Sequence, residues 1–395
     1  MPEYLAPGIY VEEINAGPRP IVAVPISTTA FVGATAKGPL NEATVVQSFA
    51  TYSEVFGASS SASPVSLAVL QFFANGGREA VVVRVTPSGR RRGTLPSPRE
   101  LIGDAKAETG IHALVNREPF GLLLTPDTSG MRLGDAKTVA KAALTFCEKH
   151  RVFYIFDVPQ GRKCGSVRAA VDWAQRSKTI RHPNAAVYFP RLSIPDPSGK
   201  ADSLLVPPSG AVAGLYARTD AERGVWKTPA GREARLYGVD GAEIDLTDAD
   251  IELLQHASIN PLRSFAGQGI VSWGARTFEP AGARTEWRYV PVRRVALFIE
   301  QSLQQGLQWT VFEPNGESLW AQIRLGVSSF MNLLFRAGTF QGAHAREAYM
   351  VKCGRETMTQ GDIEKGHIVL LVGFAPLKPA EFVVLRFALE AGSLH

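Results

Sequence analysis

The chain has 395 residues, of which 45% are hydrophobic and 20% are charged, a composition typical of globular proteins with a sizeable core. Its formal net charge is only +5, and its basic residues form no long stripe, which argues against a nucleic-acid-binding protein. It begins without the pattern of a signal peptide and contains no apolar run of about 18 residues, so we expect synthesis in the cytoplasm and no membrane insertion.

The first predicted element is a short apolar strand that stands ahead of any domain. It lies in PGIYVEEINAGPRPI, residues 7–21, where Ile9, Val11 and Ile14 are apolar and turn residues flank the stretch. The adjoining sequence offers no partner strand for it. Because an unpaired strand edge is a template for another chain, the stretch predicts an arm that pairs with a neighbouring subunit.

Short apolar strands alternate with helices through the middle of the chain. The predicted strands are 79–85, 120–126, 152–159 and 185–190, and the predicted helices include 136–150, 166–178, 212–222 and 248–258. This alternation favours βαβ units and a parallel sheet. The stretch TPSGRRRGTLPSP, residues 86–98, lacks periodicity and is predicted to be an exposed loop.

The last third of the chain contains two amphipathic helices followed by two strands. Helices are predicted over 292–306 and 317–338, where apolar residues recur at helical spacing, and Asn315 is the expected N-cap of the second. Strands over 367–376 and 381–390 close the chain. The final strand has an unpaired edge like the first, so the two ends could pair within one chain or with neighbouring subunits.

The sequence shows no arrangement of residues that points to catalysis, a cofactor or a metal. Its seven histidines include no pair at i, i+3 or i, i+4 spacing, and neither a GxSxG elbow nor a phosphate-binding loop occurs. Three widely spaced cysteines form no zinc motif. Asp245, Asp248 and Asp250 lie at a predicted helix start, where carboxylates stabilise the free backbone N–H groups, so capping is favoured over catalysis.

Several long stretches together resemble the contractile tail sheath family of phages, pyocins and related injection systems. The similar stretches are PGIYVEEI at the start, 206–231, 259–278, 289–330 and 357–387. The resemblance implies an α/β fold, α+β overall, in which a central subtilisin-like α/β domain with a parallel sheet is joined to an α+β C-terminal sheath domain and extended terminal strand arms. Because no catalytic triad is recognisable, the subtilisin likeness concerns shape alone.

The family organisation divides the chain into four expected parts. They are an N-terminal strand arm (1–20), an α/β sheath domain (21–280), a C-terminal sheath domain facing the inner tube (281–378) and a C-terminal strand arm (379–395). The loop at 86–98 lies where larger relatives carry extra domains and is too short to be one. We therefore expect a compact sheath subunit.

The resemblance implies a structural subunit rather than an enzyme. Such subunits polymerise as hexameric rings around an inner tube and contract to drive the tube through a target envelope. The implied partners are further copies of the chain, an inner tube protein, baseplate and sheath-terminator proteins, and sheath paralogues, without nucleic acid or cofactor. The particle would be a phage tail or phage-tail-like assembly, built in the cytoplasm and in some systems released.

Three groups of residues would carry this mechanism. Strands exchanged between subunits would use Ile9, Tyr10, Val11, Ile14, Phe382, Val383, Val384, Leu385 and Phe387. Linkers would bend at Gly17, Pro18, Pro20, Pro376 and Pro379. The contact with the inner tube would use Glu313, Glu317, Arg324 and Arg336.

Two other functions remain open from the sequence. An α/β-class hydrolase would share the predicted fold class, and a static tubular or capsid-like protein would share the terminal arms. The short loop at 86–98 favours a pyocin-like particle or an extracellular injection system over a large phage tail, and the sequence does not choose between those two.

Overall fold

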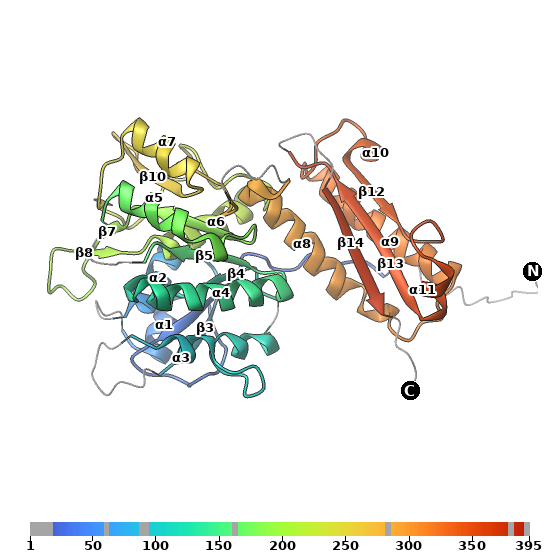
Figure 1. The fold of residues 1–395 in the computed structure, drawn as a ribbon, viewed down its shortest axis with the longest axis horizontal. Helices are drawn as coiled ribbons and strands as arrows, with labels where there is room; N and C mark the ends of the chain where they lie inside the picture. The colour runs from blue at the N-terminus through green and yellow to red at the C-terminus, as the bar shows by residue number, and fades with distance from the viewer. Residues whose placement is uncertain are drawn as a thin grey trace, which may run out of the picture. The chain divides into compact units, whose positions relative to one another are not determined.

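The computed structural model describes the chain in segments, with the backbone alone in the last one: 19–58, 63–86, 95–117, 119–159, 165–280, 286–377 and 383–390. The chain divides into two compact units. We call residues 23–301 with 376–381 the α/β unit, and residues 1–22, 302–375 and 382–395 the C-terminal unit. In Figure 1 the α/β unit runs from blue through yellow, and most of the C-terminal unit is red-orange.

An eight-stranded sheet forms the centre of the α/β unit, in the order β11-β10-β6-β5-β4-β1-β3-β2. Six adjacent strands, from β10 to β3, are parallel, whereas β2 and β11 pair antiparallel at the two edges. The predicted α/β fold with a parallel sheet is therefore confirmed. The strands are β1 (Thr29–Ala34), β2 (Thr44–Val46), β3 (Ala80–Val85), β4 (Leu122–Leu124), β5 (Phe153–Asp157), β6 (Ala185–Phe189), β10 (Asn260–Phe265) and β11 (Gly269–Ser272).

Helices cover both faces of this sheet, as Figure 1 shows. In β1, Ala30 and Val32 pack into one apolar cluster and Phe31 packs into the other, because successive side chains of a strand point to opposite faces. This burial on both sides explains why the strands are continuous apolar runs. One face carries α4 (Leu133–His150), α5 (Val167–Arg176) and α7 (Asp248–His256); the other carries α1 (Phe49–Phe56), α2 (Pro64–Ala74) and α6 (Ser209–Arg223).

The α/β unit also contains a small antiparallel sheet that the sequence did not predict. Its order is β8-β7-β9, with β7 (Leu192–Pro195) in the centre between β8 (Ser203–Val206) and β9 (Gly241–Ala242). The short elements that remain in this unit are α3 (Pro98–Ile102) and 3₁₀ turns at Gly110–Arg117, Pro126–Gly130, Lys178–Ile180 and Glu286–Arg288, and the C-terminal unit has a 3₁₀ turn at Gln308–Thr310.

The C-terminal unit combines helices with a three-stranded antiparallel sheet in the order β12-β13-β14. In β13 the alternate residues Ile368, Leu370, Val372 and Phe374 are all fully buried, so one face of this strand lies in the core. The elements are the end of α8 (Val290–Gly306), α9 (Glu317–Arg336), α10 (Ala345–Ala348), β12 (Tyr349–Lys352), α11 (Gln360–Glu364), β13 (His367–Phe374) and β14 (Val383–Glu390). The predicted order of two helices followed by two strands is present.

Two helix starts test the capping predictions. At α7, Thr247 is the N-cap and forms a capping box with Asp250, so the acidic cluster serves the helix end as predicted. At α9 the prediction was wrong, because Gly316 rather than Asn315 is the N-cap. The side chain of Asn315 is used elsewhere: it accepts a hydrogen bond of 2.8 Å from the indole N–H of Trp320.

Candidate assembly surfaces

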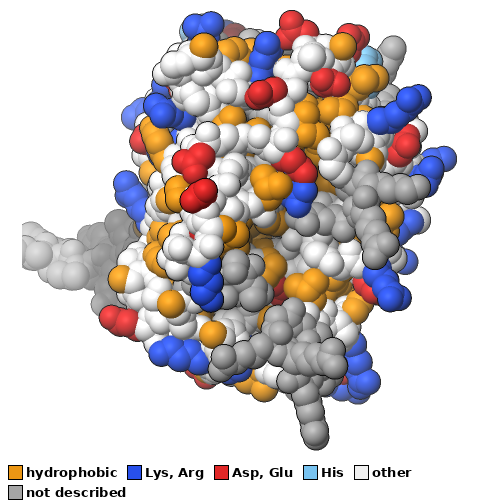
Figure 2. All heavy atoms as spheres, turned by 90° about the vertical axis from the view of Figure 1, so that its left-hand side faces the viewer, with side chains coloured by type: hydrophobic (Ala, Val, Ile, Leu, Met, Phe, Trp, Pro, Cys, Tyr) orange, Lys and Arg blue, Asp and Glu red, His pale blue; other side chains and the backbone are white. Residues whose placement is uncertain are grey.

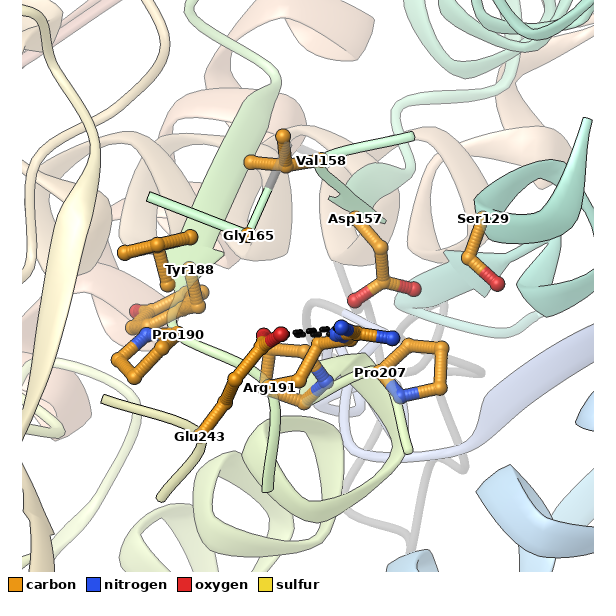
Figure 3. Close-up of a pocket in the computed structure, with 11 residues that line it drawn as sticks. Ser129, Asp157, Val158, Gly165, Tyr188, Pro190, Arg191, Pro207 and Glu243 are labelled. Carbon is orange, nitrogen blue, oxygen red and sulfur yellow. Dashed lines mark hydrogen bonds and ion pairs between the residues drawn. The ribbon is translucent and has the colours of Figure 1, made fainter. Parts of the chain in front are cut away.

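A small cavity of about 40 Å³ lies at the carboxyl edge of the parallel sheet, where β5 and β6 end (Figure 3). This edge is where open α/β sheets bind ligands. A cavity of this size is large enough to hold ordered water. The cavity is lined by Ser129, Asp157, Val158, Gly165, Tyr188, Phe189, Pro190, Arg191, Pro207, Pro208 and Glu243.

The polar groups of this cavity are already engaged with one another. Asp157, the last residue of β5, is buried and accepts hydrogen bonds from the backbone N–H of Ser209 at 3.0 Å and from its hydroxyl at 2.6 Å. Burial raises the pKa of Asp157 to about 7, and the two donors of Ser209 oppose that rise. Arg191 and Glu243 form a two-pronged ion pair, drawn dashed in Figure 3. The described lining residues include no histidine that could activate a hydroxyl group.

A second buried carboxyl group, Asp127, follows β4 at the same edge of the sheet. Its Oδ2 accepts a hydrogen bond of 2.7 Å from the backbone N–H of Ala34, and its Oδ1 is buried without a hydrogen-bond partner. Burial raises the pKa of Asp127 to about 7. Gly33 makes room for this carboxyl, because a Cβ there would lie 2.4 Å from Oδ2. Asp127 therefore belongs to the packed sheet edge rather than to a reactive centre.

Sequence reasoning did not single out either buried aspartate, although a usable signal existed. Asp157 ends an apolar strand in VFYIFD, and Asp127 follows another within three residues in LLLTPD. Polar residues that follow buried parallel strands gather at the carboxyl edge of the sheet.

We also searched the described residues for metal sites, membrane-spanning helices and strongly charged surfaces. Within the described segments no group of three or more His, Cys, Asp or Glu side chains could hold a metal ion. None of the helices there combines the length and the apolar content needed to cross a membrane. On the face of the α/β unit seen in Figure 2, positive and negative side chains are mixed rather than gathered into a field of one sign.

The C-terminal strand pairs inside its own chain in this structure. All eight residues of β14 are in register with β13, from Phe374 opposite Val383 to His367 opposite Glu390. Of the predicted arm residues, Val383, Val384, Leu385 and Phe387 lie in this strand. The predicted residues Ile9, Tyr10, Val11, Ile14, Gly17, Pro18, Pro379 and Phe382 lie outside the described residues.

Two of the predicted linker prolines are described. Pro20 lies between Arg19 and Ile21, and Ile21 is buried. Pro376 directly follows the end of the C-terminal core and is itself buried. Both prolines therefore adjoin packed residues.

The four predicted tube-contact residues fall into two pairs. Glu317 and Arg324 form an ion pair with each other at 2.7 Å, and Arg324 also donates to the backbone oxygen of Cys353. Glu313, just ahead of α9, and Arg336, in its last turn, are exposed. The structure thus brings two candidates together and leaves the other two on the surface.

The packed α/β unit, whose polar cavity residues bind each other, and the C-terminal unit with its antiparallel sheet are typical of a structural protein. Comparison with known families specifies this class. The family description "Phage tail sheath protein central domain" matches residues 112–278, and "Phage tail sheath C-terminal domain" matches residues 283–390. The chain belongs to the contractile tail sheath family.

Individual relatives agree with this assignment. The chain is 26% identical to the sheath chain of an extracellular contractile injection system, a PVC sheath complex in the contracted state, with 98% of both chains covered and a TM-score of 0.74. It is 28% identical to the anti-feeding prophage helical sheath in the contracted state, covering 98% of this chain and 99% of that one, with a TM-score of 0.73. The tail sheath protein of Vibrio phage KVP40 is 26% identical over 184 residues.

The phage relative is much longer than this chain. The match with it spans 46% of this chain and 26% of the phage protein. These relatives and structural neighbours are structural sheath proteins and not enzymes, so the hydrolase alternative is set aside.

Proposed function

We propose that the chain is the repeating subunit of a contractile sheath that stacks as hexameric rings around an inner tube and contracts to drive the tube through an envelope. The two similar solved sheaths, both in a contracted state, support this function. A further similar chain comes from the baseplate of the anti-feeding prophage, which supports contact with a baseplate. The proposed partners are other copies of the chain, the tube, the baseplate, sheath-terminator proteins and sheath paralogues. Assembly takes place inside the producing cell, and the particle acts outside it.

The observation that carries the proposal is the similarity to contracted sheaths over 98% of the chain. The strand-exchange part of the proposal starts from the pairing of β14. This strand joins the rest of its unit through a ladder to β13, and it is the last described element of the chain. A β14 from another copy could make the same ladder in the same register, which is the logic of domain swapping. Each main-chain hydrogen bond contributes about 0.5–1.5 kcal/mol net, so a ladder of this length links two subunits firmly.

The N-terminal arm would supply the second link. Residues 8–14 would add as a strand to a sheet of a neighbouring subunit, while the linkers around Gly17 and Pro379 allow the bodies to rotate during contraction. The energy would be stored in a kinetically trapped extended lattice, so no fuel site is required. The absence of a phosphate-binding loop from the sequence fits this scheme.

The contact with the tube must hold before firing and release afterwards, which suits charged groups. We assign Glu313 and Arg336 as the first candidates because both are exposed beside or on α9. Glu317 and Arg324 are second candidates, since a partner would have to compete with their existing ion pair.

Deletion of the arms tests the proposal. Removing residues 1–16 or 381–395 should leave a folded body, judged by circular dichroism, that forms no sheaths in electron micrographs. Normal tubes from either truncated chain would refute strand exchange. A static tubular protein would give tubes of one length and diameter, whereas a contractile sheath gives two states of different length and diameter.

A further inference from the structure

Two glycines lie within helices of the C-terminal unit, where alanine would favour the helix. Gly306 is the last residue of α8, and Gly326 lies in the middle of α9. Neither has a positive φ, so no turn geometry requires glycine at these positions. Because glycine destabilises a helix relative to alanine, a close approach of other atoms is the expected reason for both.

Both glycines face the short segment that leads out of the N-terminal arm. A Cβ on Gly306 would lie 2.9 Å from both Cγ atoms of Ile21, closer than side-chain carbons tolerate. A Cβ on Gly326 would lie 3.5 Å from the backbone oxygen of Arg19, which is ordinary contact. The guanidinium of Arg19 lies 5.3 Å from the ring centroid of Trp309. We call Gly306 and Trp309 the seat; Gly326 lies beside it and makes no close contact.

The segment that packs against the seat, residues 19–22, is held by one buried side chain, that of Ile21. Ile21 is 7% exposed, whereas the next residue, Val22, is 73% exposed. All contacts of the seat lie within the C-terminal unit. The extended segment is thus fixed to that unit before the chain continues to β1.

We propose that the seat is the anchor at which the N-terminal arm is fixed to its own subunit, with Ile21 as the positioning residue. This inference rests on the proposed function, because only an arm that links subunits carries load. Without the seat, a pull on the arm would bypass α8 and α9 and pass along the chain to Val24 and Ile26, the next buried residues. With Ile21 seated, the pull passes directly to α8 and α9.

The choice of glycine at position 306 follows from this role. The helix end has to let an isoleucine side chain approach its backbone, and no larger residue permits that distance. Position 326 is less demanding, since a methyl group there would meet the segment at normal contact distance. The two glycines therefore provide a disruptive substitution and a matched control.

Four variants of the full chain test the anchor: Ile21→Asp, Gly306→Ala, Gly326→Ala and Ile21→Val. The assembled fraction is measured by sedimentation and electron microscopy at equal amounts of folded protein. Ile21→Asp should lower the assembled fraction at least tenfold and Gly306→Ala severalfold, whereas Gly326→Ala should match the parent and Ile21→Val, which keeps a branched apolar side chain, should lose much less than Ile21→Asp. In the unassembled subunit, elastase cleavage at the exposed Val22 and Ala23 should speed up in the first two variants only.

Each remaining outcome has a defined meaning. Parent-like assembly of Ile21→Asp or Gly306→Ala overturns the anchor while the proposed function stands. Equal losses in Gly326→Ala and Gly306→Ala also overturn it, because they would reflect general damage to the helices. If Ile21→Asp fails to fold, the assembled fraction of Gly306→Ala alone tests the anchor. A folded parent that forms no sheaths refutes the proposed function, and the anchor falls with it.

Discussion

The α/β unit and the C-terminal unit differ in the edges of their sheets: those of the α/β unit are short or covered, and the C-terminal unit has a long open edge. In the α/β unit one edge strand, β2, has three residues, and β11 is covered along its outer side by hydrogen bonds with Ala234 and Leu236. In the C-terminal unit the edge strand β14 has eight residues, and no further strand pairs with it among the described residues. Short or covered edges prevent association, and long open edges promote it.

This difference separates folding from assembly within one chain. The α/β unit buries both faces of a large sheet, and its sheet edges are short or covered, so it forms a self-contained body. The C-terminal unit ends in a strand whose place another copy could fill. Substitutions in the first should therefore change stability, and changes at the open edge of the second should change assembly.

The largest effect on stability is expected from the buried ion pair of the α/β unit. The guanidinium of Arg294 donates to both carboxylate oxygens of Asp220 at 2.8 and 2.6 Å, and the Arg294 side chain is only 1% exposed. Asp220→Ala leaves a buried, unpaired charge, which costs about 3–5 kcal/mol. Urea unfolding followed by circular dichroism measures this loss. A change below 1 kcal/mol would mean that the pair is not buried as described.

A second effect is a pH dependence confined to the α/β unit. Burial raises the pKa of Asp127 from the ordinary 3.8 to about 7, so the folded chain holds a proton that the unfolded chain loses. The contribution of Asp127 to stability is therefore fully present below about pH 4 and falls by up to a few kcal/mol as the pH rises to about 7, and Asp157, whose pKa burial also raises to about 7, adds a fall of the same sign. Asp127→Asn should flatten this decline. Hydrogen exchange at several pH values shows which unit loses stability as the pH rises. An equal loss in peptides of the C-terminal unit would contradict the assignment of the effect to the α/β unit.

A pair of glycines tests how tightly the α/β unit is packed. A Cβ on Gly33 would lie 2.3 Å from Val65 and 2.4 Å from Asp127, so Gly33→Ala should cost about 1–3 kcal/mol or more through overpacking. Gly134, in the first turn of α4, has no atom within 4 Å of its would-be Cβ. Gly134→Ala should thus be neutral or stabilise the helix. Thermal unfolding compares the two, and similar results for both would contradict the packing described.

The smallest effect is expected at the exposed ion pair of the C-terminal unit. Glu317 and Arg324 have side chains that are 66% and 33% exposed, and water screens such pairs. Glu317→Ala should therefore change the free energy of unfolding by at most about 1 kcal/mol. A loss comparable to that of Asp220→Ala would remove the contrast between the two units.

The main elements of the fold were predictable because their apolar periodicity is strong. Parallel strands buried on both faces and helices with one apolar stripe leave clear patterns, as in β5 and α9. The strands β7 and β9 were missed, because they are short and held by distant contacts such as the ion pair of Arg191 with Glu243. The N-cap of α9 was missed because Trp320 binds the asparagine that the pattern favoured.

The assembly surfaces were less accessible to sequence reasoning. Which edge receives which strand depends on other copies of the chain, and one sequence does not contain that geometry. The seat shows a similar limit, because Gly306 resembles an ordinary helix end until Ile21 is found against it. Such long-range contacts leave no local periodicity.

Strand exchange is tested most directly by a cysteine pair across the two last strands. Leu371 lies opposite Arg386 in the β13–β14 register. Opposite residues of antiparallel strands have Cα atoms about 4.5–5.5 Å apart, within the range that a disulfide spans. The variant carries Leu371→Cys and Arg386→Cys with Cys164→Ser, and a single Leu371→Cys chain is the control.

Assembled sheaths of this variant are oxidised, dissolved in denaturant and separated without reductant. Exchange of β14 between copies predicts a ladder of covalently linked subunits that is absent from the control. If sheaths assemble normally but yield only single chains with the disulfide inside each chain, each chain keeps its own last strand. That result would contradict the proposed linkage.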